Sequence, residues 1–420
     1  MRSRLITLVL VVLSHASIAQ EIDSESVGQA FDEFQLICRK DNGALWGKSL
    51  CGRLMVVDPE TRQAWFNVEP PIPHRKLREN LYTAKYPADS NVANTSITWN
   101  GQRWIQMISV PDDPHERRAL LVHEAFHGFQ DAVGFRARDE MNDHLEDERA
   151  RLWLRLEAKA LEAALADEEQ SWLVSLHDAL SFNRRRAILY PESRSTESSL
   201  VNHEGLAEYT GIRLGGGIRA NEMAIDRLES AITRPSLVRS VGYVLGPAYG
   251  LLLDRTGREW REAALAGAPL PLLLEAAISD HADLEAAAAG YGYAEIAADE
   301  KHRGEERATQ VADLRRRFID GPVLILPFRK MNVSFDPNRV VALEGHGTIR
   351  SGARIRDLWG TLEVEGDVMF DSNWSSARVP LGEKPDGSTI SGDGWNLTLE
   401  NGWKAVPGER DGDWILQAPE

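Results

Sequence analysis

The sequence contains few cysteines, few aromatic residues and no long apolar run beyond its first residues. Two cysteines among 420 residues are too few for a zinc ribbon or for a scaffold held together by many disulfides. The most apolar internal segment, residues 270–278, is interrupted by Glu275, whereas a membrane-spanning helix needs about 18 or more apolar residues. We therefore expect no stable insertion into a membrane.

The chain is also short of positive charge. It carries 48 Lys and Arg against 64 Asp and Glu, which gives a formal net charge of −16. A surface this acidic repels phosphate backbones, so nucleic acid is not an expected partner. A content of 43% hydrophobic and 27% charged residues is typical of a globular protein, and the length suggests two or three domains.

The first 19 residues predict a secretory signal peptide. Arg2 and Arg4 precede the apolar residues 5–13, and the small residues Ser17 and Ala19 precede the predicted cleavage site. The apolar stretch is too short to span a bilayer. We therefore expect a protein that is secreted or periplasmic once residues 1–19 have been removed.

The two cysteines, Cys38 and Cys51, lie in a region that we interpret as strand-like, with a turn containing Gly and Trp between them. In an oxidising compartment they can form a disulfide that closes a hairpin loop of about a dozen residues. Such a bond would stabilise the fold by roughly 3 kcal/mol. A pair of free thiols is the alternative.

Hydropathy patterns divide the rest of the chain into three zones. Residues 20–113 contain short strand-like runs separated by turns such as Asn100-Gly101, and residues 114–318 show helical periodicity. Residues 319–420 alternate again and predict a C-terminal all-β, sandwich-like domain. The expected fold class is α+β, in which residues 20–318 form one mostly helical domain with a small N-terminal sheet.

One segment of the helical zone carries the residues of a metal site. Asp113 followed by Pro114 predicts a helix start, because Asp caps free N–H groups and Pro suits the first helical turn. Within that helix, His123 and His127 are four residues apart and share one face, where both imidazoles can bind a single ion. Glu124 lies beside them, placed to take a proton from water held by the ion.

A tetrahedral catalytic zinc needs a third protein ligand. The metzincin pattern fails because Gln130 and Val133 stand where a Gly and a His would be required. The remaining candidates are Glu204 and Glu157, which lie on apolar faces of predicted helices, where an unpaired carboxylate would be costly. For either residue the alternative is a structural ion pair with a buried Arg.

The surroundings of Glu204 carry a second signal. Gly205 follows it in the middle of a predicted helix, at a cost of about 1 kcal/mol relative to Ala, so we expect another segment to approach this turn closely. Glu208 shares the helix face of Glu204. The neighbouring His203 points about 100° away round the helix and should not bind the same ion.

Together, the motifs HEAFH and NHEGLAEY resemble those of the gluzincin zinc metallopeptidases, in which HExxH is followed by a Glu in an EGxA-type helix. The resemblance implies a zincin-like metallopeptidase domain over residues 20–318, with one Zn²⁺ bound by His123, His127 and Glu204. It implies that Glu124 is the general base. Glu208 would then orient a ligand imidazole by accepting its free N–H.

The spacing of the motifs departs from the best-known gluzincins. Glu204 follows His127 by 77 residues, which is a longer separation than in those enzymes. A helical hairpin that contains Glu157 would have to be inserted between the two motifs. Glu157 therefore remains open as the third ligand or as a group close to the metal.

Gluzincins also use a Tyr or His to stabilise the oxyanion of the reaction intermediate. This sequence offers Tyr243 and Tyr249 downstream of the ligands. We favour Tyr249, because Gly246 and Gly250 on either side of it would permit close packing against a site. Either Tyr can instead be a core residue with a satisfied hydroxyl.

These patterns favour an exported zinc-dependent peptidase that hydrolyses peptide or protein substrates with zinc-activated water and Glu124 as general base. Two alternatives remain. One is an exported binding protein in which a structural zinc ion only stabilises the fold, and the other is a zinc hydrolase of a non-peptide bond. A closed site with four protein ligands would favour a structural zinc ion, and an open coordination position in a cleft would favour an enzyme.

Overall fold

A computed structural model describes residues 22–419, apart from residues 88–89, 91, 136–140, 168, 170, 235, 276–282, 336–339 and 344. The predicted signal peptide lies outside the described residues. The α+β class is confirmed: a small N-terminal sheet precedes a helical region, and a second β region ends the described chain. The chain forms two compact units. The first comprises Met1–Gly134 and Thr210–Gly217, and the second comprises Phe135–Tyr209 and Ile218–Glu420.

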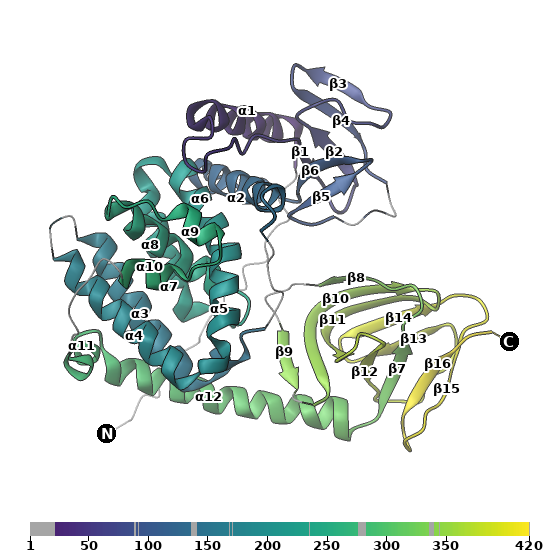
Figure 1. Cartoon of the computed structure of the whole chain (residues 1–420). Helices are drawn as coiled ribbons and strands as arrows, with labels where there is room; N and C mark the ends of the chain where they lie inside the picture. Colours follow the sequence, from purple (N-terminus) through teal and green to yellow (C-terminus); the bar gives the residue numbers. More distant parts are fainter. Residues whose placement is uncertain are drawn as a thin grey trace, which may run out of the picture. The chain divides into compact units, whose positions relative to one another are not determined.

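The first unit combines a six-stranded sheet with two helices. Its elements are α1 (Ser24–Asp41), β1 (Leu54–Val57), β2 (Gln63–Phe66), β3 (Arg75–Arg78), β4 (Leu81–Lys85), β5 (Thr95–Trp99), β6 (Gln102–Met107) and α2 (Pro114–Ala132). The strand order is β3-β4-β2-β1-β6-β5, and only the β1–β6 pair is parallel. Helix α2 packs on β5, β6 and α1 (Figure 1).

The edge hairpin of this sheet forms at the turn that the sequence predicts. Asn100 and Gly101 both have positive φ, 48° and 73°, which suits the tight turn between two twisted antiparallel strands. Trp104 of β6 is fully buried and packs against Phe66, its ring edge-on at a centroid distance of 5.4 Å. β6 is therefore anchored in the core of the sheet before the chain continues into α2.

The region around the first cysteine is helical, so its interpretation as strand-like was wrong. Helix α1 buries Val27, Phe31, Phe34 and Cys38, residues three or four apart that form one apolar face. The disulfide between Cys38 and Cys51 is confirmed. It joins the last turn of this helix to the segment before β1, and it does not close a hairpin.

The second unit contains most of the helices. They are η1 (Asp143–Glu146), α3 (Glu148–Ala166), α4 (Trp172–Leu189), η2 (Pro191–Ser193), α5 (Arg194–Leu200), η3 (Val201–Gly205), α6 (Leu206–Gly215, whose C-terminal half belongs to the first unit), η4 (Gly217–Arg219), α7 (Ala220–Thr233), α8 (Val241–Arg255), α9 (Arg261–Leu265), α10 (Leu270–Glu275), α11 (Leu284–Gly290), α12 (Tyr293–Arg315) and η5 (Arg316–Asp320). α3 packs on α4, α7, α8 and α12 and therefore lies at the centre of this bundle.

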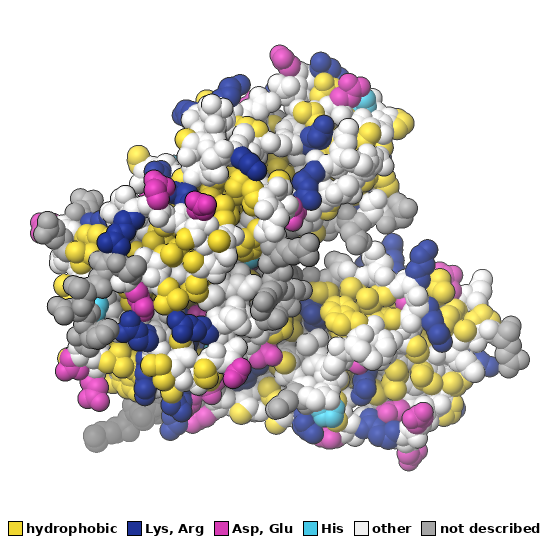
Figure 2. Space-filling view, viewed as in Figure 1, with side chains coloured by type: hydrophobic (Ala, Val, Ile, Leu, Met, Phe, Trp, Pro, Cys, Tyr) yellow, Lys and Arg dark blue, Asp and Glu magenta, His cyan; other side chains and the backbone are white. Residues whose placement is uncertain are grey.

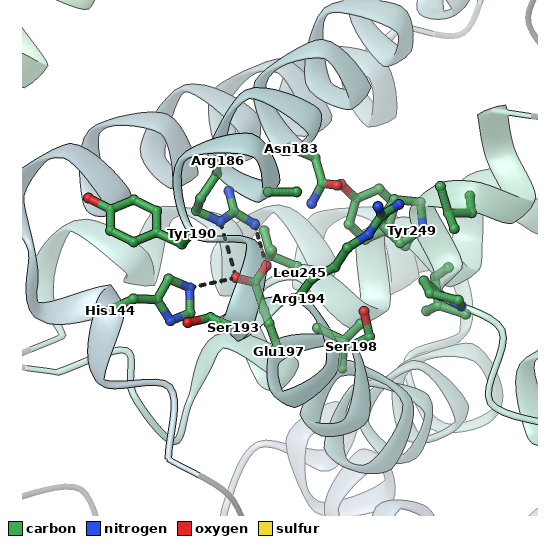
Figure 3. A pocket seen from close by; sticks show the side chains of 16 residues that line it. His144, Asn183, Arg186, Tyr190, Ser193, Arg194, Glu197, Ser198, Leu245 and Tyr249 are labelled. Carbon is green, nitrogen blue, oxygen red and sulfur yellow. Dashed lines mark hydrogen bonds and ion pairs between the residues drawn. The ribbon is translucent and has the colours of Figure 1, made fainter.

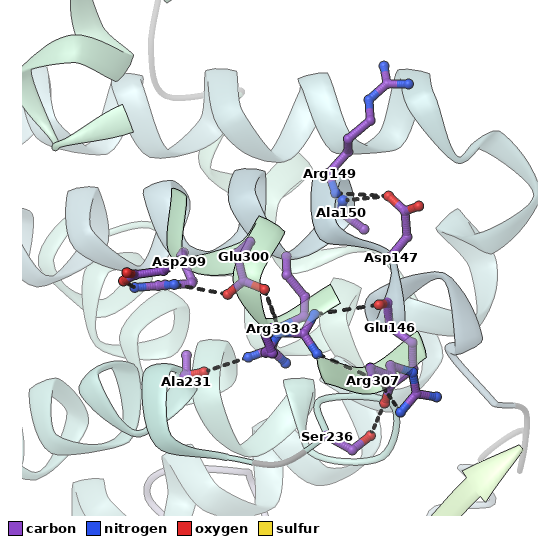
Figure 4. Close-up of polar contacts among 12 residues, drawn as sticks. Glu146, Asp147, Arg149, Ala150, Ala231, Ser236, Asp299, Glu300, Arg303 and Arg307 are labelled. Carbon is purple, nitrogen blue, oxygen red and sulfur yellow. Dashed lines mark hydrogen bonds and ion pairs between the residues drawn. The ribbon is translucent and has the colours of Figure 1, made fainter. Parts of the chain in front are cut away.

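A buried carboxylate holds the long helix α12 against α3. Glu300 of α12 accepts hydrogen bonds from Arg151 (3.0 Å) and Arg155 (2.9 Å) of α3 and from Arg303 (2.6 Å) of its own helix (Figure 4). The side chains of Arg151 and Glu300 are 0% and 2% exposed. Burial raises the pKa of Glu300, but the guanidinium charges outweigh it and lower that pKa below its ordinary value.

The C-terminal β region has a core of its own. Its strands are β7 (Val323–Pro327), β8 (Asn332–Phe335), β9 (Val340–Leu343), β10 (Gly347–Asp357), β11 (Gly360–Asp371), β12 (Ser376–Pro380), β13 (Thr389–Gly392), β14 (Trp395–Leu399), β15 (Lys404–Pro407) and β16 (Trp414–Gln417). Trp359 and Trp395 are buried there, and each indole N–H donates to a backbone carbonyl at 3.0 Å. A smaller cluster packs Leu314 and Phe318, at the end of the helical region, against Ile349 and Met369.

The described part of the chain contains no helix with the length and apolar character needed to cross a membrane. Basic and acidic side chains are both scattered over the face shown in Figure 2. The disulfide between Cys38 and Cys51 is the kind of bond that persists in oxidising compartments.

Candidate metal centre

Helix α2 presents the two histidines of the predicted metal site. Asp113 caps the helix through its side chain, which accepts from the N–H groups of His115 (2.8 Å) and Glu116 (2.9 Å), and Pro114 occupies the first turn, as predicted. His123 and Glu124 are 3% and 5% exposed. Their burial means that this face of α2 points inward, away from solvent.

The two imidazoles converge on one point. The Nε2 atoms of His123 and His127 are 3.1 Å apart, and the ring planes are nearly perpendicular, at 80°. On the other side of its ring, the Nδ1 of His127 lies 2.8 Å from the Oε1 of Gln130. If Nδ1 donates to that amide oxygen, the Nε2 of His127 keeps the lone pair that a metal ion needs.

The third member of the group is Glu204. One ligand atom from each of His123, His127 and Glu204 lies within 4.8 Å of the other two, so this group could hold a metal ion. Glu204 belongs to η3, a turn of π-helix, where the sequence predicted an ordinary helix. Such turns widen a helix by one residue and occur frequently at functional sites.

Glycines explain how α8 can pack so closely on the turn that carries Glu204. A Cβ on Gly246 would lie 2.2 Å from the Cα of Gly205, and a Cβ on Gly205 would lie 2.9 Å from the carbonyl oxygen of Gly242. The predicted close approach at Gly205 is therefore confirmed. A Cβ on Gly242 would also lie 3.1 Å from the Cβ of Glu204, so α8 packs against the base of this side chain.

Glycines also connect the same helix to the histidine helix. η3 continues into α6, and a Cβ on Gly211 or Gly215 of α6 would lie 2.4 or 2.6 Å from backbone atoms of Ala119 in α2. In addition, Trp46 donates its indole N–H to the hydroxyl of Thr210 at 3.1 Å. α6 is thus packed tightly against α2 within the first unit, about two to three helical turns beyond Glu204.

The sequence left Glu157 open as an alternative ligand, and the structure places it elsewhere. It is fully buried and forms an ion pair with Arg186, and its Oε1 accepts from Asn183 at 3.2 Å. Burial raises the pKa of this carboxyl above its ordinary value, and the charge of Arg186 opposes that rise. The group of potential ligands found among the described residues does not include Glu157.

The two candidate tyrosines have different surroundings. The hydroxyl of Tyr249 donates to Glu157, and the ring is fully buried, so this hydroxyl is used inside the bundle and is not directed at the histidines. Tyr243 is half-buried and follows Gly242, whose backbone faces Glu204. Our preference for Tyr249 as the oxyanion group therefore has no support in this geometry, and Tyr243 lies on the turn of α8 closer to Glu204.

Two neighbours of Glu204 on its own helix also have partners. The Oε1 of Glu208 accepts a hydrogen bond from Arg227 at 2.8 Å and forms an ion pair with it. The Nδ1 of His203 lies 3.1 Å from the Oε1 of Glu204, and its ring stacks on Phe135. His203 thus contacts the carboxylate of Glu204 and is not one of the three grouped ligands.

Sequence reasoning missed two of these roles. Gln130 was noted only because it breaks the metzincin pattern, although its position three residues after His127 places it one helical turn away on the same side. The contact of His203 with Glu204 could not be read from helical periodicity, because the two residues are adjacent in sequence.

Comparison with known proteins adds no relative: no family model, no curated protein and no solved structure matches this chain. The case for a function therefore rests on the residues and their geometry.

Proposed function

We propose that this protein is an exported zinc-dependent peptidase of the gluzincin type. The observation that carries the proposal is the convergence of His123, His127 and Glu204, with the buried Glu124 beside the first histidine. Two imidazoles and one carboxylate are the donor set of many catalytic zinc sites, which leave one coordination position for substrate or water. Export is part of the proposal, supported by the basic and apolar N-terminal residues and by the disulfide.

The residues present fit a zinc ion well. Zinc takes imidazole nitrogen and carboxylate oxygen readily, whereas magnesium and calcium prefer an all-oxygen set. When bound, zinc supplies Lewis-acid chemistry that polarises a carbonyl and makes water a stronger acid. His127, oriented by Gln130, and Glu204, contacted by His203 and packed at its base against Gly242, would hold it.

Glu124 has the position of a general base. It is next to His123 on α2, and its side chain is inward and 5% exposed. A carboxylate shielded from bulk water can accept a proton from an attacking water molecule and then deliver it to the leaving amine. That pair of transfers is what hydrolysis of a peptide bond requires from the protein.

The sheet beside the site favours a peptide over another substrate. β5 is an edge strand in the described sheet, and a Cβ on Gly128, the residue after His127, would lie 3.6 Å from the Oγ of Ser96 in that strand. An edge strand offers unpaired backbone groups that an extended peptide can use as a new neighbour. Arg103 holds this edge against α2 through its ion pair with Asp131 and its hydrogen bond to Ser96 (3.0 Å).

The test compares Glu124→Gln with Glu192→Gln, an exposed glutamate in η2. Both variants should bind about one equivalent of zinc, because neither residue belongs to the three-ligand group. Only Glu124→Gln should lose hydrolysis of dye-quenched casein, by about a hundredfold or more. Zinc content is measured by atomic emission, and hydrolysis is measured by dye release.

The possible outcomes separate the proposal from its rivals. Full activity in zinc-loaded Glu124→Gln would contradict the assigned base. If the wild-type protein binds zinc but does not hydrolyse casein, the alternative of a binding protein with a purely structural zinc ion is favoured. Zinc that survives Glu204→Ala in a folded protein would remove Glu204 from the ligand set.

A further inference from the structure

The buried arginines of this protein are paired with carboxylates. The described chain buries four arginines, and each forms an ion pair with a glutamate: Arg117, Arg151, Arg155 and Arg186. Figure 3 shows the pair that Arg186 forms with Glu197. Arg350 of β10 is half-buried but forms no ion pair or hydrogen bond within the described chain. A charge that is partly withdrawn from water without a counter-ion is costly, which makes Arg350 a candidate binding group.

A β-bulge turns Arg350 toward the apolar face of the C-terminal sheet. The register between β10 and β11 shifts at Gly352, whose φ of 67° suits the extra residue of a bulge. After the bulge, Ala353 packs in the main core of the β region, whereas before it Ile349 packs in the smaller cluster on the other face. Because side chains alternate along a strand, Arg350 shares the face of Ala353 and lies opposite the core residue Val368.

Three aromatic rings surround the guanidinium of Arg350. Its Cζ lies 3.8 Å from the ring centroid of Phe335 in β8, 5.2 Å from that of Trp374 and 5.8 Å from that of Phe370 in β11. Aromatic rings at such distances attract a cation. β8, β10 and β11 are neighbours in the C-terminal sheet (Figure 1). The rings therefore hold the guanidinium in place without neutralising its charge.

The positive charge of Arg350 remains available to a ligand. Burial and the nearby Arg239 lower the pKa of the guanidinium to about 10, so it is still charged at neutral pH, and no carboxylate of the described chain opposes them. The Nε of Arg350 is buried without a hydrogen-bond partner, whereas the two Nη atoms, which also have none, are not fully buried. A carboxylate from outside can therefore reach the Nη atoms and form charge-assisted hydrogen bonds.

Trp374 supplies an exposed apolar surface beside Arg350. It is 38% exposed, and its φ of 56° is rare for a bulky residue. Asp371 holds the turn that imposes this conformation, because its carboxylate accepts from the N–H of Ser375 (2.7 Å) and from the hydroxyl of Ser376 (2.9 Å). Backbone strain of this kind is concentrated at functional positions, including those that hold ligands.

The neighbouring edge of the sheet suits a peptide. Within the described chain β8, which carries Phe335, pairs only with β10, so its other side has no strand partner. An extended peptide can hydrogen-bond to such an edge and direct every second side chain to the same face. This favours a peptide as the source of the carboxylate.

We propose that the C-terminal β region binds an acidic segment of a peptide at Arg350 and Trp374. A glutamate or aspartate carboxylate would pair with the guanidinium of Arg350, and an apolar side chain two residues away would pack on the ring of Trp374. Trp and Arg are residue types that often dominate the energy of binding at interfaces. The proposal is independent of the metal centre, because neither residue belongs to the three-ligand group.

The experiment measures binding by isothermal titration calorimetry to the full-length Glu124→Gln protein, which should not cleave the probes. The probes are N-acetyl-Leu-Ala-Glu-Ala-Leu-amide, the same peptide with Gln in place of Glu, and trigalacturonate, a sugar that also carries carboxylates. We expect the Glu peptide to bind about tenfold or more tightly than the Gln peptide. Equal affinities of the two peptides, binding of neither, or tighter binding of trigalacturonate would overturn the proposal.

Variants in the same background test the two residues. Arg350→Gln should abolish the preference for the Glu peptide, and Trp374→Ala should weaken binding of both peptides about tenfold. Arg356→Gln removes an exposed arginine from the same strand and should change neither affinity. Circular dichroism checks that the variants are folded. If Arg350→Gln does not fold, Arg350→Lys, which keeps the charge but lacks the planar fork, should reduce the preference. An undiminished preference in a folded Arg350 variant would contradict the proposal, whatever the result of the zinc and casein experiments.

Discussion

At the scale of single residues, the site depends on groups that orient the proposed ligands. His127 is fixed by Gln130, and Glu204 is contacted by His203, so two of the three ligands have a neighbour that restricts their rotation. Such partners matter because a ligand held in one rotamer loses less entropy when the metal binds. Gln130 lies outside both motifs that suggested the site, and His203 lies within NHEGLAEY but was not predicted to contact Glu204.

Gln130 provides the residue-scale prediction. Gln130→Leu removes the acceptor for the Nδ1 of His127 and should weaken zinc binding about tenfold to a hundredfold. Gln130→Glu keeps an acceptor in the same place and should retain most of the affinity. Competition with a zinc chelator of known affinity measures both values. Equal affinity in Gln130→Leu and the wild type would show that the contact does not orient His127.

At the scale of elements, the helices around the site pack through glycine. α8 and η3 meet at Gly242, Gly246 and Gly205, and α6 meets α2 at Gly211 and Gly215, in each case at distances that leave no room for a Cβ. These contacts hold the turn with Glu204 and the helix with the histidines through backbone surfaces, which are stiffer than side chains.

Gly246 provides a prediction about this packing. Gly246→Ala would place a Cβ 2.2 Å from the Cα of Gly205, so the two elements must separate. The free energy of unfolding should fall by about 1–3 kcal/mol, and zinc affinity should fall with it. Gly290→Ala is the matched control, because a Cβ there meets no atom within 4 Å and should be neutral or slightly stabilising. Urea unfolding measures both, and equal behaviour of the two variants would contradict the packing argument.

The carboxylate that joins α12 to α3 provides a prediction about pH. Because the pKa of Glu300 is lowered in the folded state, its ionised form stabilises the fold above its ordinary pKa of 4.5, and this contribution is lost as the pH falls below that value. Glu300→Gln leaves Arg151 buried without its partner and should cost about 3–5 kcal/mol at pH 7.

The difference in stability between Glu300→Gln and the wild type should therefore shrink as the pH is lowered from 5 toward 3. Thermal unfolding over this range measures it. Glu305→Gln, on the exposed side of the same helix, is the control and should change stability little at any pH. A constant difference across the range would contradict the assigned ionisation of Glu300.

At the scale of the whole molecule, the disulfide ties the first helix to the sheet. It links Cys38 of α1 to Cys51, 13 residues later, just before β1. Replacing both cysteines with serine should lower the free energy of unfolding by about 3 kcal/mol, mainly because the unfolded chain regains the entropy of the open loop. Denaturant unfolding with and without reductant measures the change. Reductant should destabilise only the wild type. Equal stability of the wild type and the variant in the absence of reductant would contradict the prediction.

The local features of this protein could be predicted from its sequence. The cap at Asp113, the hairpin turn at Asn100-Gly101 and the shared helix face of His123 and His127 all depend on a few neighbouring residues, whose backbone preferences are strong. The α+β class followed from the same kind of evidence, because periodicity changes along the chain. Helix α1 was missed even though its buried residues repeat at intervals of three and four, because the strand-like runs that follow dominated the interpretation.

Only the tertiary structure could decide between equivalent side chains. In the sequence pattern, Glu204 and Glu157 both lie on buried helix faces. In the structure, Arg186 of another helix forms an ion pair with Glu157, and the hydroxyl of Tyr249 donates a hydrogen bond to the same carboxylate. Glu204 instead lies close to His123 and His127, where the glycine contacts of α8 and α6 hold its helix. The physical reason is that the role of a buried carboxylate depends on which partner lies next to it. Helix packing brings that partner from a distant part of the sequence, so local patterns cannot identify it.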